Sequence, residues 1–145
     1  MRYWVGVVGS RETTERLRTE NETWWCAQKQ AAAGDLIALY VARSKLKDLP
    51  QSQGGVVAIF EILGVGADRE MDCRSFGGGM GGQILASTKV VVKERFAVSL
   101  NLVDIRRDDR LSALQFVRRS FQGTCFIASG EEFQRISCLL ARLQA

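Results

Sequence analysis

Uninterrupted apolar runs are the clearest feature of the hydrophobic pattern. The runs Leu36–Val41 and Val56–Leu63 are apolar nearly throughout. A strand that lacks the alternation of apolar and polar residues is typically buried on both faces. Tyr3–Val8, rich in aromatic and β-branched residues, predicts a first strand, and Lys89–Leu100 and Gly123–Ala128 predict two later ones. The pattern therefore predicts a sheet, curled as a barrel, with helices packed against it.

Capping residues mark where helices begin. Ser10 can cap a short polar helix over Glu12–Arg18. Ser129 and Glu132 form a capping box, which predicts a helix with its apolar residues at helical spacing. Asp108 or Asp109 can cap another helix. The apolar stripes of the last two helices comprise Phe133, Ile136, Leu139, Leu140 and Leu143, and Leu111, Leu114 and Val117.

The remaining segments read as turns and loops. Gly34-Asp35 is a turn before a strand, and Arg43–Gln53 is polar and holds the only proline. The segment 19–33 shows no strong strand period, and Gly64–Gln83 reads as a flexible tract. The order is strand, helix, several strands, helix, strand, helix, with no internal repeat. We expect a single α+β domain over residues 1–145.

Composition and charge narrow the function only slightly. The chain has 145 residues, a net charge of +4 and 46% hydrophobic residues, which is ordinary for a globular domain. A mildly basic balance permits a polyanionic partner without requiring one. We find no signal-peptide layout and no apolar stretch near the roughly 20 residues of a membrane span. We therefore expect a cytoplasmic protein that does not enter membranes.

Histidine is absent, and the four cysteines are far apart. Without an imidazole there is no Ser-His or Cys-His nucleophile pair and no His metal ligand. Cys26, Cys73, Cys125 and Cys138 contain no Cys-x-x-Cys pair, so we expect reduced, mostly buried thiols rather than a disulfide framework or a metal site. No cofactor is predicted, and binding is favoured over catalysis.

The adjacent tryptophans Trp24 and Trp25 are the first candidate for a binding site. On a strand, neighbouring side chains face opposite ways, so one ring can enter the core while the other faces outward. An outward aromatic wall suits a stacked planar ligand such as a nucleobase. The alternative is that both rings belong to the core or its rim. It carries equal weight, because Trp is often largely buried.

Basic and small polar residues are further candidates. Basic groups near the Trp pair, Lys29, Arg43 and Lys45 among them, would give a stacking platform an electrostatic rim. Arg118 and Arg119 could contact phosphates, although a solvated helix face explains that cluster as well. Asn21 and Ser10 could read a base edge, or could serve only as caps and turns. The Gly-rich tract Phe76–Gly82 is not followed by the Gly-Lys-Ser/Thr of a phosphate loop and reads as a surface loop.

Five pieces of the chain form a pattern in their order and spacing. They are Tyr3-Trp4-Val5, then Asn21 with Trp25-Cys26-Ala27, Gly34-Asp35-Leu36-Ile37 ending in Tyr40, Gly55–Phe60, and Gly123–Ala128 with Glu131-Glu132-Phe133. This pattern resembles the EVE domains, which are related to YTH domains within the PUA-like superfamily. The resemblance implies a distorted β-barrel of about five or six strands flanked by helices. It also implies a pocket for a flipped-out, modified nucleobase, with Trp25 as cage aromatic, Asn21 as polar reader, Trp24 as second wall, and Trp4 and Tyr40 at the border.

The sequence therefore predicts a non-enzymatic reader of DNA or RNA that recognises a modified, for example methylated, base in an aromatic pocket. Two other classes stay open. The first is an RNA-associated enzyme, or a regulator that binds a small planar metabolite, on the same barrel; the enzyme would use Asp35 or Glu61 as acid or base, since no histidine is available. A protein-interaction module would instead show an exposed apolar patch.

Overall fold

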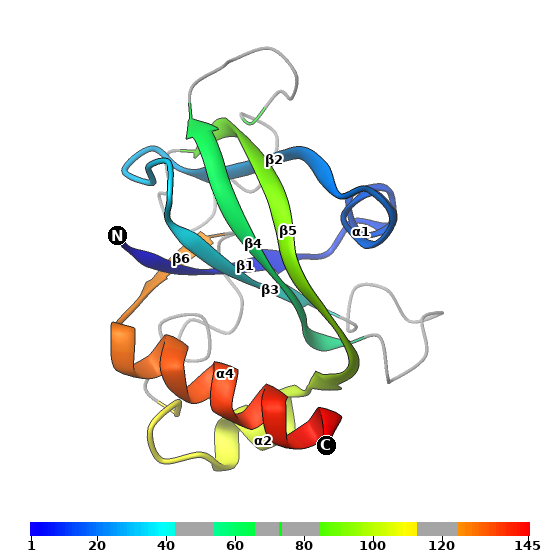
Figure 1. Ribbon diagram of the computed structural model, residues 1–145, viewed down its shortest axis with the longest axis vertical. Coiled ribbons are helices and arrows are strands. Elements are labelled where there is room, and N and C mark those ends of the chain that lie inside the picture. The colour runs from blue at the N-terminus through cyan, green and yellow to red at the C-terminus, as the bar shows by residue number, and fades with distance from the viewer. Residues whose placement is uncertain (43–53, 66–72, 74–84, 113–124) are drawn as a thin grey trace.

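The computed structural model describes residues 1–42, 54–65, 73, 85–112 and 125–145. The labels below follow Figure 1. The strands are β1 (Tyr3–Val8), β2 (Glu22–Gln28), β3 (Leu36–Val41), β4 (Gly55–Val65), β5 (Leu85–Leu100) and β6 (Cys125–Ala128), and the helices are α1 (Arg11–Thr19), α2 (Leu102–Arg107) and α4 (Gly130–Gln144).

The strands form one curled sheet in the order β2-β5-β4-β3-β1-β6. Only β1 and β3 pair in parallel, and the chain between them contains α1 and β2; the other pairs are antiparallel. The two ends of the sheet approach each other, because Gln28 Nε2 of β2 donates a hydrogen bond of 2.6 Å to the Cys125 carbonyl oxygen of β6. The predicted α+β barrel flanked by helices is confirmed (Figure 1).

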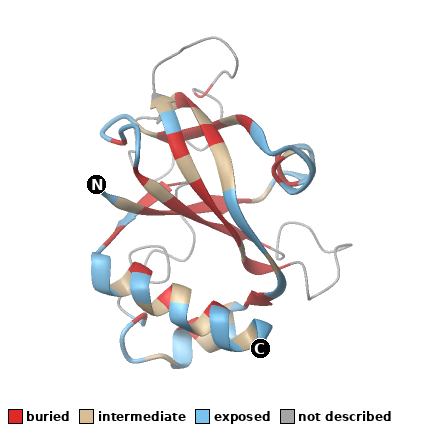
Figure 2. Cartoon of the chain, in the orientation of Figure 1, coloured by how far each residue is buried: buried red, intermediate tan, exposed pale blue. Residues whose placement is uncertain are grey.

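The strands β1 and β3 are buried on both faces, as the apolar runs predict, whereas β5 is exposed around Lys93–Arg95 (Figure 2). The inner cluster lies on one face and includes Trp4, Trp25 and Phe60, with Leu17 of α1 packed against them. The outer cluster lies on the other face and joins strand residues such as Tyr40 to the apolar stripe of α4, which comprises Phe133, Ile136 and Leu140. Alternate residues of a strand therefore serve two separate cores.

The helix caps largely follow the sequence. Ser10 caps α1 by accepting a hydrogen bond from the Thr13 amide, and Ser129 with Glu132 forms the complete capping box of α4. α2 was not predicted, although its start is signalled by Asn101, whose side chain accepts from the Asp104 amide. Most of the helix predicted after Asp108 lies outside the described residues, as do the loop Arg43–Gln53 and the tract Phe76–Gly82.

β2 is a strand that the sequence pattern missed. It pairs with β5 along its whole length, from Glu22 opposite Val91 to Gln28 opposite Leu85. The apolar alternation is weak here because Cys26, which faces away from Trp25, is buried as completely as its neighbours. The tryptophans do face opposite ways, as expected: Trp25 lies in the inner cluster and Trp24 is half-buried on the other side.

The expectation of four reduced thiols is wrong for two of them. Cys26 and Cys73 form a disulfide across 47 positions of sequence, with their Cα atoms 5.7 Å apart. The tertiary fold brings Cys73 to the outward face of β2, and no local spacing in the sequence reveals such a contact. Cys125 and Cys138 are free thiols, the first buried and the second exposed. Burial raises the pKa of the Cys125 thiol to about 12, so it stays protonated.

Across the described ranges, none of the helices combines the length and the apolar character that crossing a membrane requires.

Candidate functional site

A pocket opens where β4 and β5 lose their register. Val56 pairs with Leu100 and Ala58 pairs with Arg95, so a single residue of β4 faces four residues of β5 between these pairs. The β3–β4 ladder shifts at the same level, between Leu39 and Tyr40. Val57 is thus the extra residue of a bulge against β3, whereas between β4 and β5 the extra residues, 96–99, belong to β5.

The side chain of Gln144, at the end of α4, forms hydrogen bonds with the backbone of β5 where β5 does not pair with β4. The Val98 amide donates to Gln144 Oε1 at 2.9 Å, and Gln144 Nε2 donates to the Val98 carbonyl oxygen at 2.7 Å. An amide side chain thereby takes the place of a strand neighbour and meets the backbone's need for partners. Gln144 therefore stabilises the stretch of β5 that does not pair with β4.

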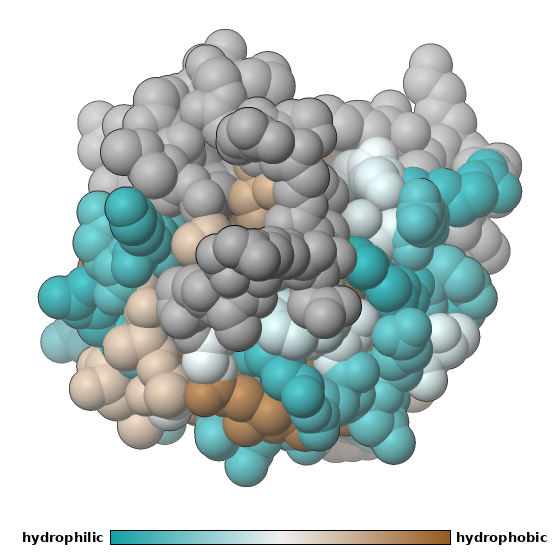
Figure 3. Space-filling model, turned by 90° about the horizontal axis from the view of Figure 1, so that it is seen from above, coloured by the Kyte–Doolittle hydropathy of each residue, from teal (hydrophilic) through white to brown (hydrophobic). Residues whose placement is uncertain are grey.

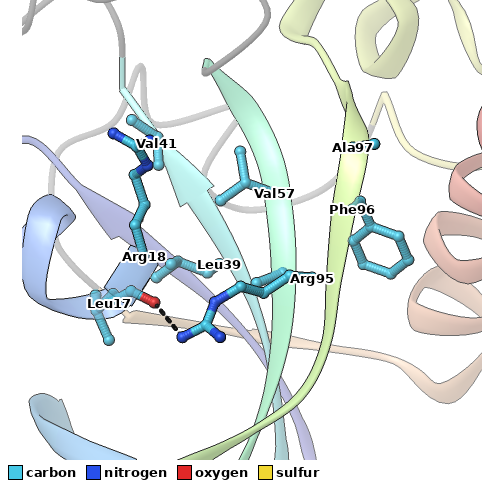
Figure 4. A pocket seen from close by; sticks show the side chains of 9 residues that line it. Leu17, Arg18, Leu39, Val41, Val57, Arg95, Phe96 and Ala97 are labelled. Atoms are coloured by element: carbon cyan, nitrogen blue, oxygen red, sulfur yellow. Dashed lines mark hydrogen bonds between the residues drawn. The ribbon is translucent and has the colours of Figure 1, made fainter. Parts of the chain in front are cut away.

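The resulting cavity, which we call the α1–β5 pocket, has a volume of about 360 Å³. Figure 4 shows Val57 and Leu39 projecting between the two arginines Arg18 and Arg95, with α1 on one side and β5 on the other. The volume is in the range of pockets that hold small ligands. The described residues that line it are Leu17, Arg18, Leu39, Val41, Val57, Ala58, Arg95, Phe96 and Ala97.

Arg95 fastens α1 to β5 at one end of the pocket. Its guanidinium donates to the carbonyl oxygens of Leu17 and Glu20 at 3.2 and 2.6 Å. It also donates to Asn21 Oδ1 at 3.1 Å. These carbonyls belong to the C-terminal end of the helix, where a positive charge is favourable. Arg95 therefore positions the helical wall of the pocket.

Arg18 is the less constrained cation of the pocket. Its side chain is 42% exposed, and one Nη atom lies 3.4 Å from Glu15 Oε2 of the same helix. An exposed pair at that spacing on a helix contributes little free energy. In Figure 4 the guanidinium of Arg18 reaches toward Val41, away from that of Arg95. Its remaining N–H groups can serve a ligand at the mouth.

The predicted pocket aromatics are placed differently. Trp25 is 1% exposed in the inner cluster, and its ring packs against Gly6. Its Nε1 is buried without a hydrogen-bond partner in the described part of the chain. Trp24 lies on the outer side of β2, with Lys89 Nζ 5.8 Å from its ring centre. Neither ring lines the α1–β5 pocket.

Trp4 and Tyr40 lie on opposite faces of the sheet. Trp4 belongs to the inner cluster, and Tyr40 to the outer one. Burial raises the pKa of Tyr40 to about 12, against a smaller opposing effect of Arg106. The structure therefore does not bring Tyr40 together with the tryptophans.

Two residues were predicted to read a base edge or to serve only as caps and turns. Ser10 is the cap of α1. Asn21 lies at the turn into β2, where its side chain holds Arg95 and its carbonyl oxygen accepts from the Val92 amide at 2.8 Å. Asn21 therefore touches the α1–β5 pocket only through Arg95.

Most of the predicted phosphate contacts fall outside the described residues. Lys29 is exposed in the turn after β2. Arg43, Lys45, Arg118 and Arg119 lie in segments that the structure does not describe. Sequence reasoning missed Arg18 and Arg95. The polar run Lys93-Glu94-Arg95 inside an otherwise apolar strand block is the signal that could have indicated a break in pairing.

Asp35 is a structural carboxylate that closes the turn before β3. Oδ1 accepts from the Arg2 amide at 2.9 Å, and Oδ2 accepts from Trp4 Nε1 and the Ala32 amide, each at 3.0 Å. Burial alone would raise the pKa of Asp35, but these three hydrogen bonds outweigh it and hold the pKa below the ordinary value of 3.8. The turn reading of Gly34-Asp35 is confirmed.

This arrangement predicts an acid-dependent loss of stability. The carboxylate contributes stability that is fully present above its unfolded-state pKa near 3.8 and is lost as the pH falls through the lower folded-state pKa. Comparing the free energy of unfolding of wild type and Asp35→Asn from pH 7 to pH 2 should show a difference that shrinks below pH 3.8. A difference that stays constant with pH would contradict this role of the charge.

Among the described residues, no group of three or more Cys, Asp or Glu side chains is placed to hold a metal ion.

Hydrophobic surface is limited on the face that Figure 3 shows. On the coloured part of the surface in Figure 3, hydrophilic side chains predominate and the most hydrophobic colour is confined to one area. The exposed large hydrophobic residues come from separate parts of the chain: Met1, Leu63, Val98, Val103 and Ile127.

No protein-family model matches the sequence, and no curated protein is similar enough in sequence to count as a relative. Solved structures do match. A hypothetical protein from Leishmania major superposes with a TM-score of 0.71 at 14% identity, covering 100% of this chain and 98% of that one. Human THYN1 protein, solved in complex with DNA containing 5-methylcytosine, gives 0.65 at 10% identity, covering 96% and 97%. A mutant of ZmASCH from Zymomonas mobilis gives 0.54 at 11% identity, covering 96% and 99%.

At these identities the likeness establishes the fold alone, which is a PUA-like barrel.

Proposed function

We propose that this chain is a non-enzymatic nucleic-acid-binding module of the EVE type that takes one modified, flipped-out base into the α1–β5 pocket. The observation that carries the proposal is the pocket itself, a cavity of about 360 Å³ with an aliphatic floor and arginines at its rim. An apolar floor with few polar groups is the usual form of a small-ligand site. Cations at the mouth suit a ligand attached to phosphates.

The THYN1 structure supports the ligand class. That protein was solved with DNA containing 5-methylcytosine, and its fold covers nearly the whole of this chain. A base that leaves the stack costs a few kcal/mol, which the receiving pocket must offset. In this chain the α1–β5 pocket combines an apolar floor with N–H groups of Arg18 at its mouth.

We propose that the base is held by an aliphatic slot rather than by the aromatic cage that the resemblance implies. Phe96 contributes the one aromatic ring among the described lining residues, and it packs partly against the outer cluster. Leu39, Val41 and Val57 are left to contact the base. Burying one methyl group against such a floor contributes about 0.8 kcal/mol, or roughly a fourfold preference for a methylated base.

The chemistry of the lining supports binding without catalysis. Among its described residues the ionisable side chains are the two arginines, which do not give up a proton in proteins. Of the carboxylates that an enzyme would need, Asp35 is held by three hydrogen bonds, and Glu61 lies 3.4 Å from Lys93 Nζ. Neither carboxylate lines the pocket.

The test is fluorescence anisotropy with single-stranded oligonucleotides that differ at one position, at a fixed moderate salt concentration. That position carries a methylated base, its unmethylated counterpart or an abasic site. We expect the methylated base to bind about fourfold more tightly than the unmethylated one, and the abasic site to bind most weakly. Equal affinity for all three would contradict the proposal, because phosphate contacts alone do not distinguish them.

A matched pair of variants locates the effect. Val57→Met extends a longer side chain into the pocket, whereas Val103→Met makes the same change at an exposed position on α2. We expect Val57→Met to reduce binding of the base-carrying oligonucleotide about tenfold, toward that of the abasic one, and Val103→Met to leave both unchanged. If the two variants bind alike, the base does not enter this pocket.

A further inference from the structure

The described side chains that line the α1–β5 pocket can donate hydrogen bonds but cannot accept them. Of these nine side chains, seven are hydrocarbon and two are arginines. A guanidinium has N–H donors and no acceptor. Glu15 is bound to Arg18 but is not part of the lining. The backbone around the bulge offers N–H and C=O groups alike, so it does not favour one kind of base edge over another.

The two arginines are not equally free to donate. Arg95 spends both Nη groups on Leu17, Glu20 and Asn21. Arg18 is engaged only in its exposed pair with Glu15 in the described part of the chain. Arg18 is therefore the side chain that can turn an N–H toward a bound ligand.

We infer that Arg18 makes the pocket selective for a base whose edge carries a keto oxygen, and that the favoured ligand is a 5-methylated dioxopyrimidine of the thymine type. The inference rests on the proposed base-binding function and deepens it. A keto oxygen at C4 accepts from a guanidinium, and the C5-methyl group next to it fits an aliphatic floor. The amino group of cytosine at the same place finds no acceptor among the described lining side chains and loses the partner that it had in water.

This selectivity differs from the ligand in the THYN1 structure, whose DNA contains 5-methylcytosine. Thymine and 5-methylcytosine share the methyl group and differ in the keto or amino group at C4 and in the proton at N3. Comparing the two bases therefore tests recognition of the C4 group by Arg18, while the contact of the methyl group with the aliphatic floor stays the same.

The experiment uses four single-stranded oligonucleotides, identical except for one cytosine, 5-methylcytosine, uracil or thymine, with an abasic strand as reference. Methylation and the keto group vary independently in this set. We expect thymine to bind most tightly, about fourfold above uracil for the methyl group. We expect it to bind about tenfold above 5-methylcytosine, since an unpaired amino group forfeits roughly one hydrogen bond.

Arg18→Gln tests the residue, and Arg142→Gln is its control, because both remove one exposed positive charge from a helix. The amide of glutamine can present either a donor or an acceptor. In Arg18→Gln we expect the preference for thymine over 5-methylcytosine to fall to about one, while thymine stays above uracil. Arg142→Gln keeps both preferences.

The outcomes separate the inference from the proposed function. A methyl preference without a keto preference, or tighter binding of 5-methylcytosine than of thymine, overturns the inference and leaves the proposed function standing. A keto preference that survives Arg18→Gln overturns the role of Arg18. Affinity equal to that of the abasic strand for every base overturns both the inference and the proposed function.

Discussion

Replacing Trp25 with alanine is expected to lower the free energy of unfolding by about 3–5 kcal/mol. The indole is 1% exposed and packs in the inner cluster, where Gly6 leaves room for it. A Cβ at Gly6 would lie 2.5 Å from Cη2 of this ring. Truncation removes those contacts and leaves a cavity that a curled sheet cannot close. The measurement is urea unfolding followed by circular dichroism.

Trp24→Ala is the matched control, because it removes the same side chain from the next position of the same strand. Trp24 is only half-buried, and Lys89 Nζ lies 5.8 Å from the centre of its ring. We expect a loss of about 1 kcal/mol. Equal losses in the two variants would contradict the assignment of Trp25 to the core. If Trp25→Ala is destabilised as expected, weak binding by this variant reports damage to the fold and not a lost stacking contact.

The second large effect is expected for Gly55→Ala, at about 3 kcal/mol or more. Gly55 has φ of +93°, and a Cβ there would collide with the Leu100 carbonyl oxygen and with the Asn101 backbone. Backbone atoms cannot swing aside as a flexible side chain does. Because Gly55 begins β4 beside the Val56–Leu100 pair, the variant should also disturb the α1–β5 pocket.

Gly34→Ala separates the collision from the backbone conformation. Gly34 has the same φ of +93°, but a Cβ there would meet nothing within 4 Å. We expect a loss of only about 1 to 2 kcal/mol, the cost of placing alanine in the left-handed region. Thermal unfolding of both variants measures the comparison. A Gly55→Ala protein as stable as Gly34→Ala would show that the Leu100 backbone gives way.

The sequence predicted the elements whose signals are local. Apolar runs identified β3 and β4, and the caps Ser10 and Ser129 marked the starts of α1 and α4. β2 was missed because Cys26, which faces away from its neighbour Trp25, is also buried, and this hides the alternation that marks a strand. The Cys26–Cys73 disulfide could not be predicted, since it depends on a contact across 47 positions.

The candidate site was harder to predict, because it depends on a loss of register between two strands. Trp25 looked like a cage residue because Trp is large and amphipathic, but its place in the core depends on Gly6, in a strand far from it in sequence. The pocket depends on the Val57 bulge and on Arg95, which binds the end of α1 from β5. These features depend on how the strands pair with one another, which the residue pattern of a single strand does not reveal.

The most direct test of the central claim, that a base enters the α1–β5 pocket, is an amide chemical-shift titration. The protein is titrated with the thymine oligonucleotide and, separately, with its abasic counterpart, and the shifts are subtracted. We predict that base-dependent shifts centre on Val57, Arg95 and Ala97, with Arg18 across the mouth. Base-dependent shifts centred instead on Trp24 and Lys89 would contradict the account and return the site to the outer side of β2.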